Sequence, residues 1–202
     1  MPTIKEKIAA RIHRWGAGRA FTPKDFLDLS GRGMVDVTLS QLVSAGVIRR
    51  VARGLYDYPK HSDALGLTLS PDIDEIARAI ARRFRWRIIP SGDWAANALG
   101  LSTQVPAKIT YLSDGPNREF ELGKQTIHFK HARPKETRIE NQLSSLVIQA
   151  LRYLGKDEVG SEVISRLRTR LSPAEKRRLL RDTRFSTDWI FAVARQVAEE
   201  DD

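Results

Sequence analysis

Residues 21–59 have the sequence FTPKDFLDLSGRGMVDVTLSQLVSAGVIRRVARGLYDYP, and this stretch decides the expected fold. Thr22-Pro23 is typical of a helix start, because threonine can cap free backbone N–H groups and the fixed φ of proline suits the first helical position. Ser30–Gly33 predicts a turn, since two closely spaced glycines favour one. A short helix over about residues 22–29 and a tight turn are therefore expected.

A second helix is expected over about residues 34–45. Its apolar residues recur at helical spacing and share one face: Val35, Leu39, Leu42 and Val43. Gly46 is a typical left-handed cap. Two β-prone runs follow, residues 47–51 and 55–58, and the connection Ala52-Arg53-Gly54 predicts a hairpin. Helix, turn, helix and hairpin in this order are typical of a winged helix-turn-helix, which sets one helix in the major groove of DNA.

The opposite face of this second helix carries the prediction of function. Its residues are small or hydrogen-bonding, where a solvated helix would usually carry Lys and Glu: Val37, Ser40, Gln41 and Ser44. Glutamine can pair with adenine, serine with several base edges, and valine with a thymine methyl group. Four arginines flank the face and are expected to contact phosphates: Arg32, Arg49, Arg50 and Arg53. A generic three-helix domain with a solvated basic hairpin is the alternative.

The composition also favours an anionic partner. The chain of 202 residues has a net charge of +9 and a pI near 10.1. Residues 1–60 hold 11 Lys and Arg against 5 Asp and Glu, which concentrates +6 of this charge in the stretch expected to bind DNA. There is no cysteine, which removes disulfides and thiol catalysis and agrees with the cytoplasmic location that we expect. No apolar run is long enough for a membrane span.

Two tracts resemble a known family. LSQLVSAGVIRRVARGLYDYPK at residues 39–60 resembles the winged helix of AbiEi-type antitoxins from bacterial abortive-infection and toxin–antitoxin systems, in which a similar "L…G.I.R..RGLY..P" run closes the domain. SGDWAANALGLSTQVPAKITYLSDG at residues 91–115 resembles the start of that family's second domain. The likeness covers residues 4–135 and is weak over the last 60 or so.

This resemblance implies an antitoxin that binds double-stranded operator DNA, represses its own operon and counters a cognate nucleotidyltransferase toxin encoded alongside. Direct contact with the toxin is left open, as is binding to DNA as a dimer or cooperatively. The alternative is a plain winged-helix transcriptional regulator whose second domain dimerises or senses a ligand. A nucleic-acid-processing enzyme is a third class.

The remaining chain predicts an α+β protein with two domains. The winged helix-turn-helix is expected over residues 1–62, and an antitoxin domain over residues 68–202, separated by a linker within 59–71. In the second domain we expect a helix to about Phe84, strands near 86–90, 107–112, 119–122 and 125–130 forming a small antiparallel sheet, and a helix over 138–154. Three helices are expected at the C-terminus: 158–171, 173–182 and 187–199.

No enzymatic, metal or cofactor site is predicted. Ser91-Gly92-Asp93 is similar to a fragment of nucleotidyltransferase motifs but lacks their spaced acids, and the phosphate-cradling loop of the Walker type is absent. Acids in the first turn of a helix, as at Asp72 and Asp74, are expected from the helix dipole alone. His128 and His131 would face opposite sides of a strand.

Eight basic residues lie between positions 166 and 184, and three interpretations stay open for them: a solvated face, a second contact to the DNA backbone, or a toxin-facing surface. These residues are Arg166, Arg168, Arg170, Lys176, Arg177, Arg178, Arg181 and Arg184.

Overall fold

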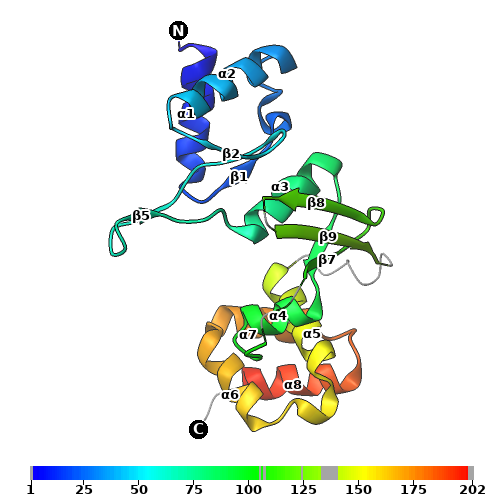
Figure 1. Cartoon of the computed structure of the whole chain (residues 1–202). Helices are drawn as coiled ribbons and strands as arrows, with labels where there is room; N and C mark the ends of the chain where they lie inside the picture. The colour runs from blue at the N-terminus through cyan, green and yellow to red at the C-terminus, as the bar shows by residue number, and fades with distance from the viewer. Residues whose placement is uncertain (1, 105, 107, 124, 133–140, 200–202) are drawn as a thin grey trace. The chain divides into compact units, whose positions relative to one another are not determined.

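The computed structural model describes residues 2–104, 106, 108–123, 125–132 and 141–199 (Figure 1). Within these ranges the protein is α+β, with eight α-helices, small sheets and a helical C-terminal region. The chain divides into two compact units. We call residues 1–86 with 120–126 the N-terminal unit, and residues 87–119 with 127–202 the C-terminal unit.

The N-terminal unit begins with helix α1 (Ile4–Trp15), which Thr3 and Glu6 start with a capping box. The elements that follow are β1 (Ala20–Phe21), the 3-10 helix η1 (Pro23–Phe26), α2 (Arg32–Ser44), β2 (Arg49–Ala52) and β3 (Leu55–Asp57). The three strands form an antiparallel sheet in the order β1-β3-β2. Side chains from both helices, η1 and the sheet share one apolar core: Ile8, Ile12, Phe21, Phe26, Val35, Leu39, Leu42, Ile48 and Tyr56.

The helix expected over residues 22–29 is shorter than predicted, because only η1 forms there. Asp25 turns back and accepts hydrogen bonds from both the backbone N–H and the hydroxyl of Thr22. This reciprocal cap gives hydrogen-bond partners to the backbone and side chain of Thr22. Nucleating a helix is unfavourable, and Gly31 follows too soon for added helical hydrogen bonds to offset that cost. The second predicted helix and the hairpin are confirmed, with Gly54 at φ 69° in the turn.

Helix α3 (Ile73–Phe84) belongs to the N-terminal unit. It packs on β1 and β3. Arg82 donates a hydrogen bond of 2.8 Å to the carbonyl of Ala20, and Arg19 forms an ion pair of 3.2 Å with Glu75. The compact units therefore differ from the expected division into 1–62 and 68–202, because the apolar face of α3 is buried against the first sheet. The expected linker contains a small hairpin, β4 (His61–Ser62) with β5 (Leu67–Thr68).

The later chain forms β6 (Ile88–Pro90), α4 (Gly92–Ala98), β7 (Ile109–Ser113), β8 (Arg118–Leu122) and β9 (Gln125–His131). The four strands form one sheet in the order β6-β7-β9-β8. This sheet is mixed rather than antiparallel, because β6 pairs antiparallel with β7 whereas β7 pairs parallel with β9. The expectation of an antiparallel sheet was wrong on this point: β9 returns beside β7 and leaves β8 at the edge.

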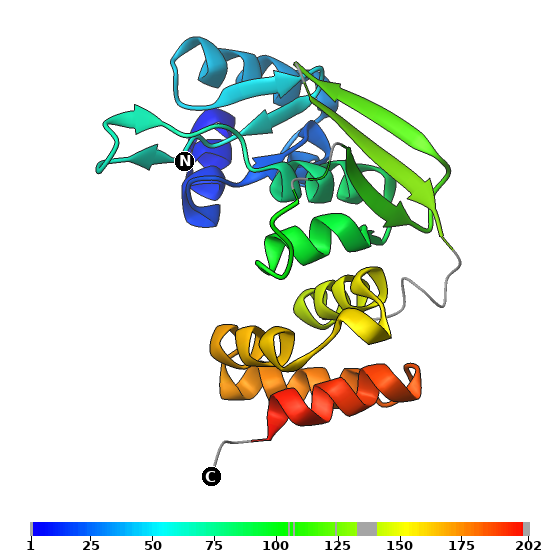
Figure 2. The same ribbon diagram turned by 60° about the horizontal axis from the view of Figure 1, so that its bottom comes forward.

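Five helices of the C-terminal unit share one core (Figure 2). After α4 these are α5 (Gln142–Leu154), α6 (Ser161–Arg170), α7 (Pro173–Asp182) and α8 (Asp188–Ala198), with the 3-10 helix η2 (Lys156–Glu158) between α5 and α6. The predicted start of α5 at residues 138–140 lies outside the described residues. Within the described ranges, no helix combines the length and the apolar run that crossing a bilayer requires.

Candidate nucleic-acid interface

Helix α2 separates its residues cleanly between core and surface. Val35, Thr38, Leu39 and Leu42 are buried against the N-terminal core. The four residues predicted to face bases are all exposed, with Val37 at 53%. They occupy positions i, i+3, i+4 and i+7, which lie on one helical face. The structure thus brings Val37, Ser40, Gln41 and Ser44 together on an open surface, which we call the α2 face.

The α2 face also contains a residue that the sequence analysis missed. Met34 lies three positions before Val37 and its side chain is 54% exposed. Its helical spacing from Val37 could have placed it on this face. Two apolar side chains therefore adjoin the hydrogen-bonding ones at the N-terminal end of the face, and no acidic residue occupies the first turn of the helix.

Arg32 lies at the start of α2, where it forms an ion pair of 2.8 Å with Asp36. Both side chains are about half exposed, at 53% and 45%. A solvated pair of this kind contributes little free energy, so a phosphate can replace the carboxylate as the partner of Arg32. Arg32 therefore stays available to an anionic ligand.

Arg50 and Arg53 are exposed on the hairpin, Arg50 on β2 and Arg53 in the turn. Within the described part of the chain, neither guanidinium has an ion pair. A Cβ atom built on Gly54 would lie 3.8 Å from Nη1 of Arg83, so α3 brings a further arginine to the hairpin turn. Arg83 belongs to a run of basic residues at the end of α3 that suits a helix C-terminus or an anionic surface, but its place beside the hairpin was not predicted, because this helix was expected in the other domain.

Arg49 is held inside the N-terminal unit, unlike the other three arginines. It donates to both carboxylate oxygens of Asp57, at 3.0 and 2.6 Å, and to the carbonyl of Leu69 at 3.2 Å. The Asp57 side chain is only 2% exposed. The hydrogen bond to Asp57 raises the pKa of the Arg49 guanidinium, and burial acts in the opposite direction. We therefore remove Arg49 from the phosphate-contacting set and assign it to holding the hairpin.

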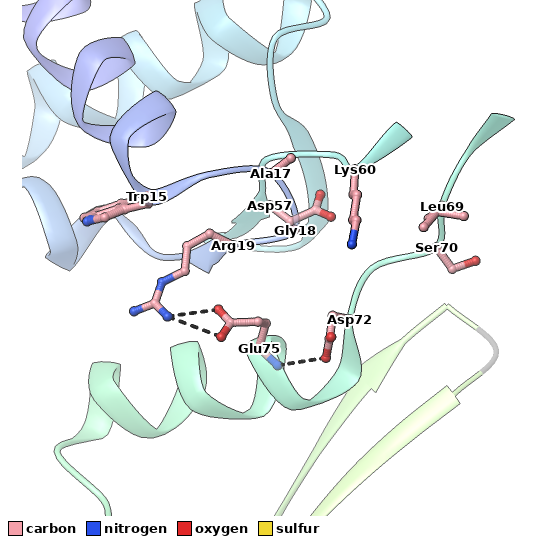
Figure 3. Close-up of a pocket in the computed structure, with 10 residues that line it drawn as sticks. All are labelled: Trp15, Ala17, Gly18, Arg19, Asp57, Lys60, Leu69, Ser70, Asp72 and Glu75. Atoms are coloured by element: carbon pink, nitrogen blue, oxygen red, sulfur yellow. Dashed lines mark hydrogen bonds and ion pairs between the residues drawn. The ribbon is translucent and has the colours of Figure 1, made fainter. Parts of the chain in front are cut away.

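A cavity of about 430 Å³ lies elsewhere in the N-terminal unit, between the end of α1 and the start of α3 (Figure 3). Most charged side chains of its lining have partners within the N-terminal unit. Arg19 pairs with Glu75, and Asp72 accepts hydrogen bonds from the backbone N–H groups of Asp74 and Glu75. A molecule bound in this cavity would contact the ammonium group of Lys60 and the side chain of Trp15, which is 36% exposed.

The titratable groups of the described residues form no cluster of three or more that could hold a metal ion. His128 lies on β9, where it contacts Glu119 at 2.9 Å. His131 contacts the carbonyl of Gly115 at 3.0 Å. Each histidine thus has a partner of its own. Asp93 accepts hydrogen bonds from the Ser91 hydroxyl and the backbone N–H of Trp94, which makes the Ser-Gly-Asp run a helix start.

These features define an α+β protein with an exposed, uncharged helix face beside a basic hairpin. The chain belongs to a family described as a family of unknown function, DUF6088, whose model matches residues 7–179. No curated protein matches the sequence. Among solved structures, the crystal structure of RV2827C protein from Mycobacterium tuberculosis is similar over 98% of this chain and 77% of that chain, with 14% identity and a TM-score of 0.43.

Proposed function

We propose that the N-terminal elements form a winged helix-turn-helix that binds duplex DNA, with α2 as the recognition helix. The order α1, β1, η1, α2, β2, β3 and the sheet order β1-β3-β2 support this assignment. The observation that carries the proposal is the exposure of the α2 face, where Gln41, Ser40 and Val37 offer hydrogen bonds and an apolar contact without charge. Arg32, Arg50 and Arg53 would contact the backbone.

On the resemblance of residues 39–60 and 91–115, we further propose that the protein is an AbiEi-like antitoxin in the cytoplasm. It represses its own operon through this DNA-binding module and counters a cognate nucleotidyltransferase toxin. A plain transcriptional regulator is the second candidate. The cavity beside Trp15 favours this second candidate, because its volume of about 430 Å³ is within the range of small-ligand sites.

Two substitutions test the DNA proposal by separating base contacts from phosphate contacts. Arg53→Ala should weaken binding to every duplex and lower the slope of log K against log salt by about 0.9, the value for one lost phosphate contact. Gln41→Ala should instead reduce the preference for the operator over a scrambled duplex by about five- to 150-fold, as for a lost bidentate base contact. Fluorescence anisotropy with duplexes from upstream of the gene measures both quantities.

Matched controls exist in the C-terminal unit. Gln142 and Arg152 are exposed on α5, so Gln142→Ala and Arg152→Ala remove the same side chains at another place. If Gln41→Ala and Arg53→Ala bind the operator as their controls do, the assignment of the α2 face is wrong. Co-expression with the product of the adjacent gene, scored for growth, separates the two candidate functions, since only an antitoxin should rescue cells from a toxic neighbour.

A further inference from the structure

The turn between α7 and α8 carries a surface that the proposed function does not use. Phe185 lies in this turn and is 95% exposed, more than any other large hydrophobic side chain among the described residues. Arg177 and Arg181 of α7 and Arg184 of the turn are also exposed. Arg177 and Arg181 are four residues apart and lie on one side of α7, and Arg184 and Phe185 follow Arg181 by three and four residues in the turn. We call these four residues the arginine–phenylalanine patch.

The backbone of the turn is fixed rather than loose. The hydroxyl of Thr183, which is fully buried, donates to the carbonyl of Leu179 at 2.8 Å. The N–H of Ser186 donates to the carbonyl of Thr183 at 2.8 Å. Thr183 therefore anchors the turn to α7 on one side, and Ile190 of α8, which is buried in the helical core, anchors it on the other. Phe185 is presented to solvent by a rigid support.

The positive charge of the patch is not compensated within the described part of the chain. Arg178 follows Arg177 in the sequence and pairs with Asp182 at 3.7 Å, and Glu175 is engaged at the start of α7 by Ser172. The side chains of Arg177, Arg181 and Arg184 have no such partner there. Three guanidinium groups and one aromatic ring thus face solvent together, and a polyanion is the complementary partner.

The exposed ring of Phe185 indicates which kind of polyanion fits the patch: an acidic protein, a nucleic-acid duplex or single-stranded RNA. Protein interfaces have apolar centres built from several side chains, whereas Phe185 stands alone among arginines. A duplex hides the faces of its bases, so it offers an exposed ring nothing to stack on. Single-stranded RNA presents splayed bases to aromatic side chains and phosphates to arginines, and the adjacent hydroxyls of Ser186 and Thr187 can meet a 2′-hydroxyl.

We propose that the C-terminal unit binds single-stranded RNA at the arginine–phenylalanine patch, with Phe185 stacking on one base and Arg177, Arg181 and Arg184 contacting phosphates. Stacking supplies affinity without strong sequence preference, because every base has a π face. The site is separate from the α2 face, so the protein would hold duplex DNA and single-stranded RNA through different surfaces.

Anisotropy of a short fluorescein-labelled oligo(U) titrated with the full chain tests this proposal. Phe185→Ala should lower the affinity by about five- to 150-fold, the range for one lost base stack, and Phe185→Trp should restore it. Arg177→Ala and Arg181→Ala should each lower the slope of log K against log salt by about 0.7. Phe185 is exposed, so these losses should appear without a change in the melting temperature.

Arg152→Ala removes an exposed arginine of α5 and serves as the control for general charge. A parallel titration with oligo(dT) tests whether the partner is RNA, because the chain should bind oligo(U) more tightly than oligo(dT). The operator duplex tests independence from the proposed function, since Phe185→Ala should leave duplex binding unchanged. If the α2 variants do not alter duplex binding, the DNA proposal is wrong, but the RNA proposal is unaffected.

Several results would overturn the RNA site. These are absence of oligo(U) binding by the native chain at low salt, equal losses in Arg152→Ala and Arg177→Ala, or unchanged binding in Phe185→Ala. Equal or tighter binding of oligo(dT) would reject RNA as the partner. Binding of poly-L-glutamate that depends on the arginines but not on Phe185, without oligo(U) binding, would replace the proposal with an acidic protein partner.

Discussion

Arg49 and Asp57 show how one residue changes its role once the strands pair. The two residues lie directly opposite each other on β2 and β3, which brings the guanidinium against both carboxylate oxygens. A carboxylate as buried as that of Asp57 is stable as an anion only with such a partner. The neighbouring arginine, Arg50, points outward on the same strand and stays exposed. Adjacent arginines therefore have a structural and a candidate binding role.

Arg49→Ala should lower the free energy of unfolding of the N-terminal unit by about 2–4 kcal/mol, because it leaves the buried Asp57 carboxylate without its partner. The Arg49 side chain is 33% exposed, which places the expected loss below that of a fully buried pair. Arg50→Ala is the matched control and should change stability by less than about 0.5 kcal/mol. Urea unfolding followed by circular dichroism measures both. Equal losses in the two variants would contradict the assignment of Arg49.

Helices α4 and α5 depend on a close approach at one glycine. A Cβ atom on Gly92 would lie 2.5 Å from Cβ of Tyr153 and 2.8 Å from the carbonyl oxygen of Gln149. Ala95 and Ala96 of α4 are fully buried beside the same helix pair. Small residues on α4 therefore allow the backbone of one helix to approach the other, and the core of the C-terminal unit is built on that contact.

Gly92→Ala should lower the free energy of unfolding of the C-terminal unit by about 1–3 kcal/mol, since the new methyl group meets backbone and cannot be accommodated without moving a helix. Gly33→Ala in α2 is the control, because no atom lies within 4 Å of a Cβ built there. That change should stabilise the protein by about 0.4–1 kcal/mol, through the entropy of the unfolded chain. Thermal unfolding monitored by circular dichroism distinguishes the two signs; a neutral Gly92→Ala would show that the helices can separate freely.

Helix α3 belongs to the N-terminal unit, whereas the sequence had placed it in the second domain. Its residues Ile76, Ala77 and Ile80 are buried. Arg82 of α3 donates to the carbonyl of Ala20 on β1, and the side chain of Lys24 donates to the carbonyl of Arg83 on α3. The candidate DNA-binding module is therefore completed by a helix that follows the small β4–β5 hairpin. This explains why the charge near the hairpin turn includes Arg83.

A fragment of residues 1–86 should melt at a higher temperature than a fragment of residues 1–62, because only the longer one covers β1 with α3. A fragment of residues 1–70 is the control, since it adds the β4–β5 hairpin and the Leu69 carbonyl that accepts a hydrogen bond from Arg49, but not α3, and it should melt below the fragment of residues 1–86. Differential scanning calorimetry gives the three melting temperatures. If all three coincide, α3 does not stabilise the N-terminal elements, and the boundary expected near residue 65 is the better description.

The sequence predicted most helices and strands to within a few residues, because their signals are local. Thr3 with Glu6, and Ser172 with Glu175, form the capping boxes that start α1 and α7. The spacing of Val35, Leu39 and Leu42 predicted which face of α2 is buried. The length of η1 was harder to predict, since a short amphipathic pattern does not show whether a helix can be nucleated before the next glycine.

By itself, the sequence determined the order of elements, the α+β class, the concentration of positive charge near the N-terminus and the uncharged character of the α2 face. Propensity, caps and periodicity act over a few residues, so they can be recognised along the chain. Only the tertiary structure decided that Arg49 neutralises Asp57, that β9 runs parallel to β7, that α3 covers the first sheet and that Phe185 is exposed. Each of these depends on contacts between segments distant in sequence or on which side chains the core leaves uncovered, and no local pattern encodes such contacts.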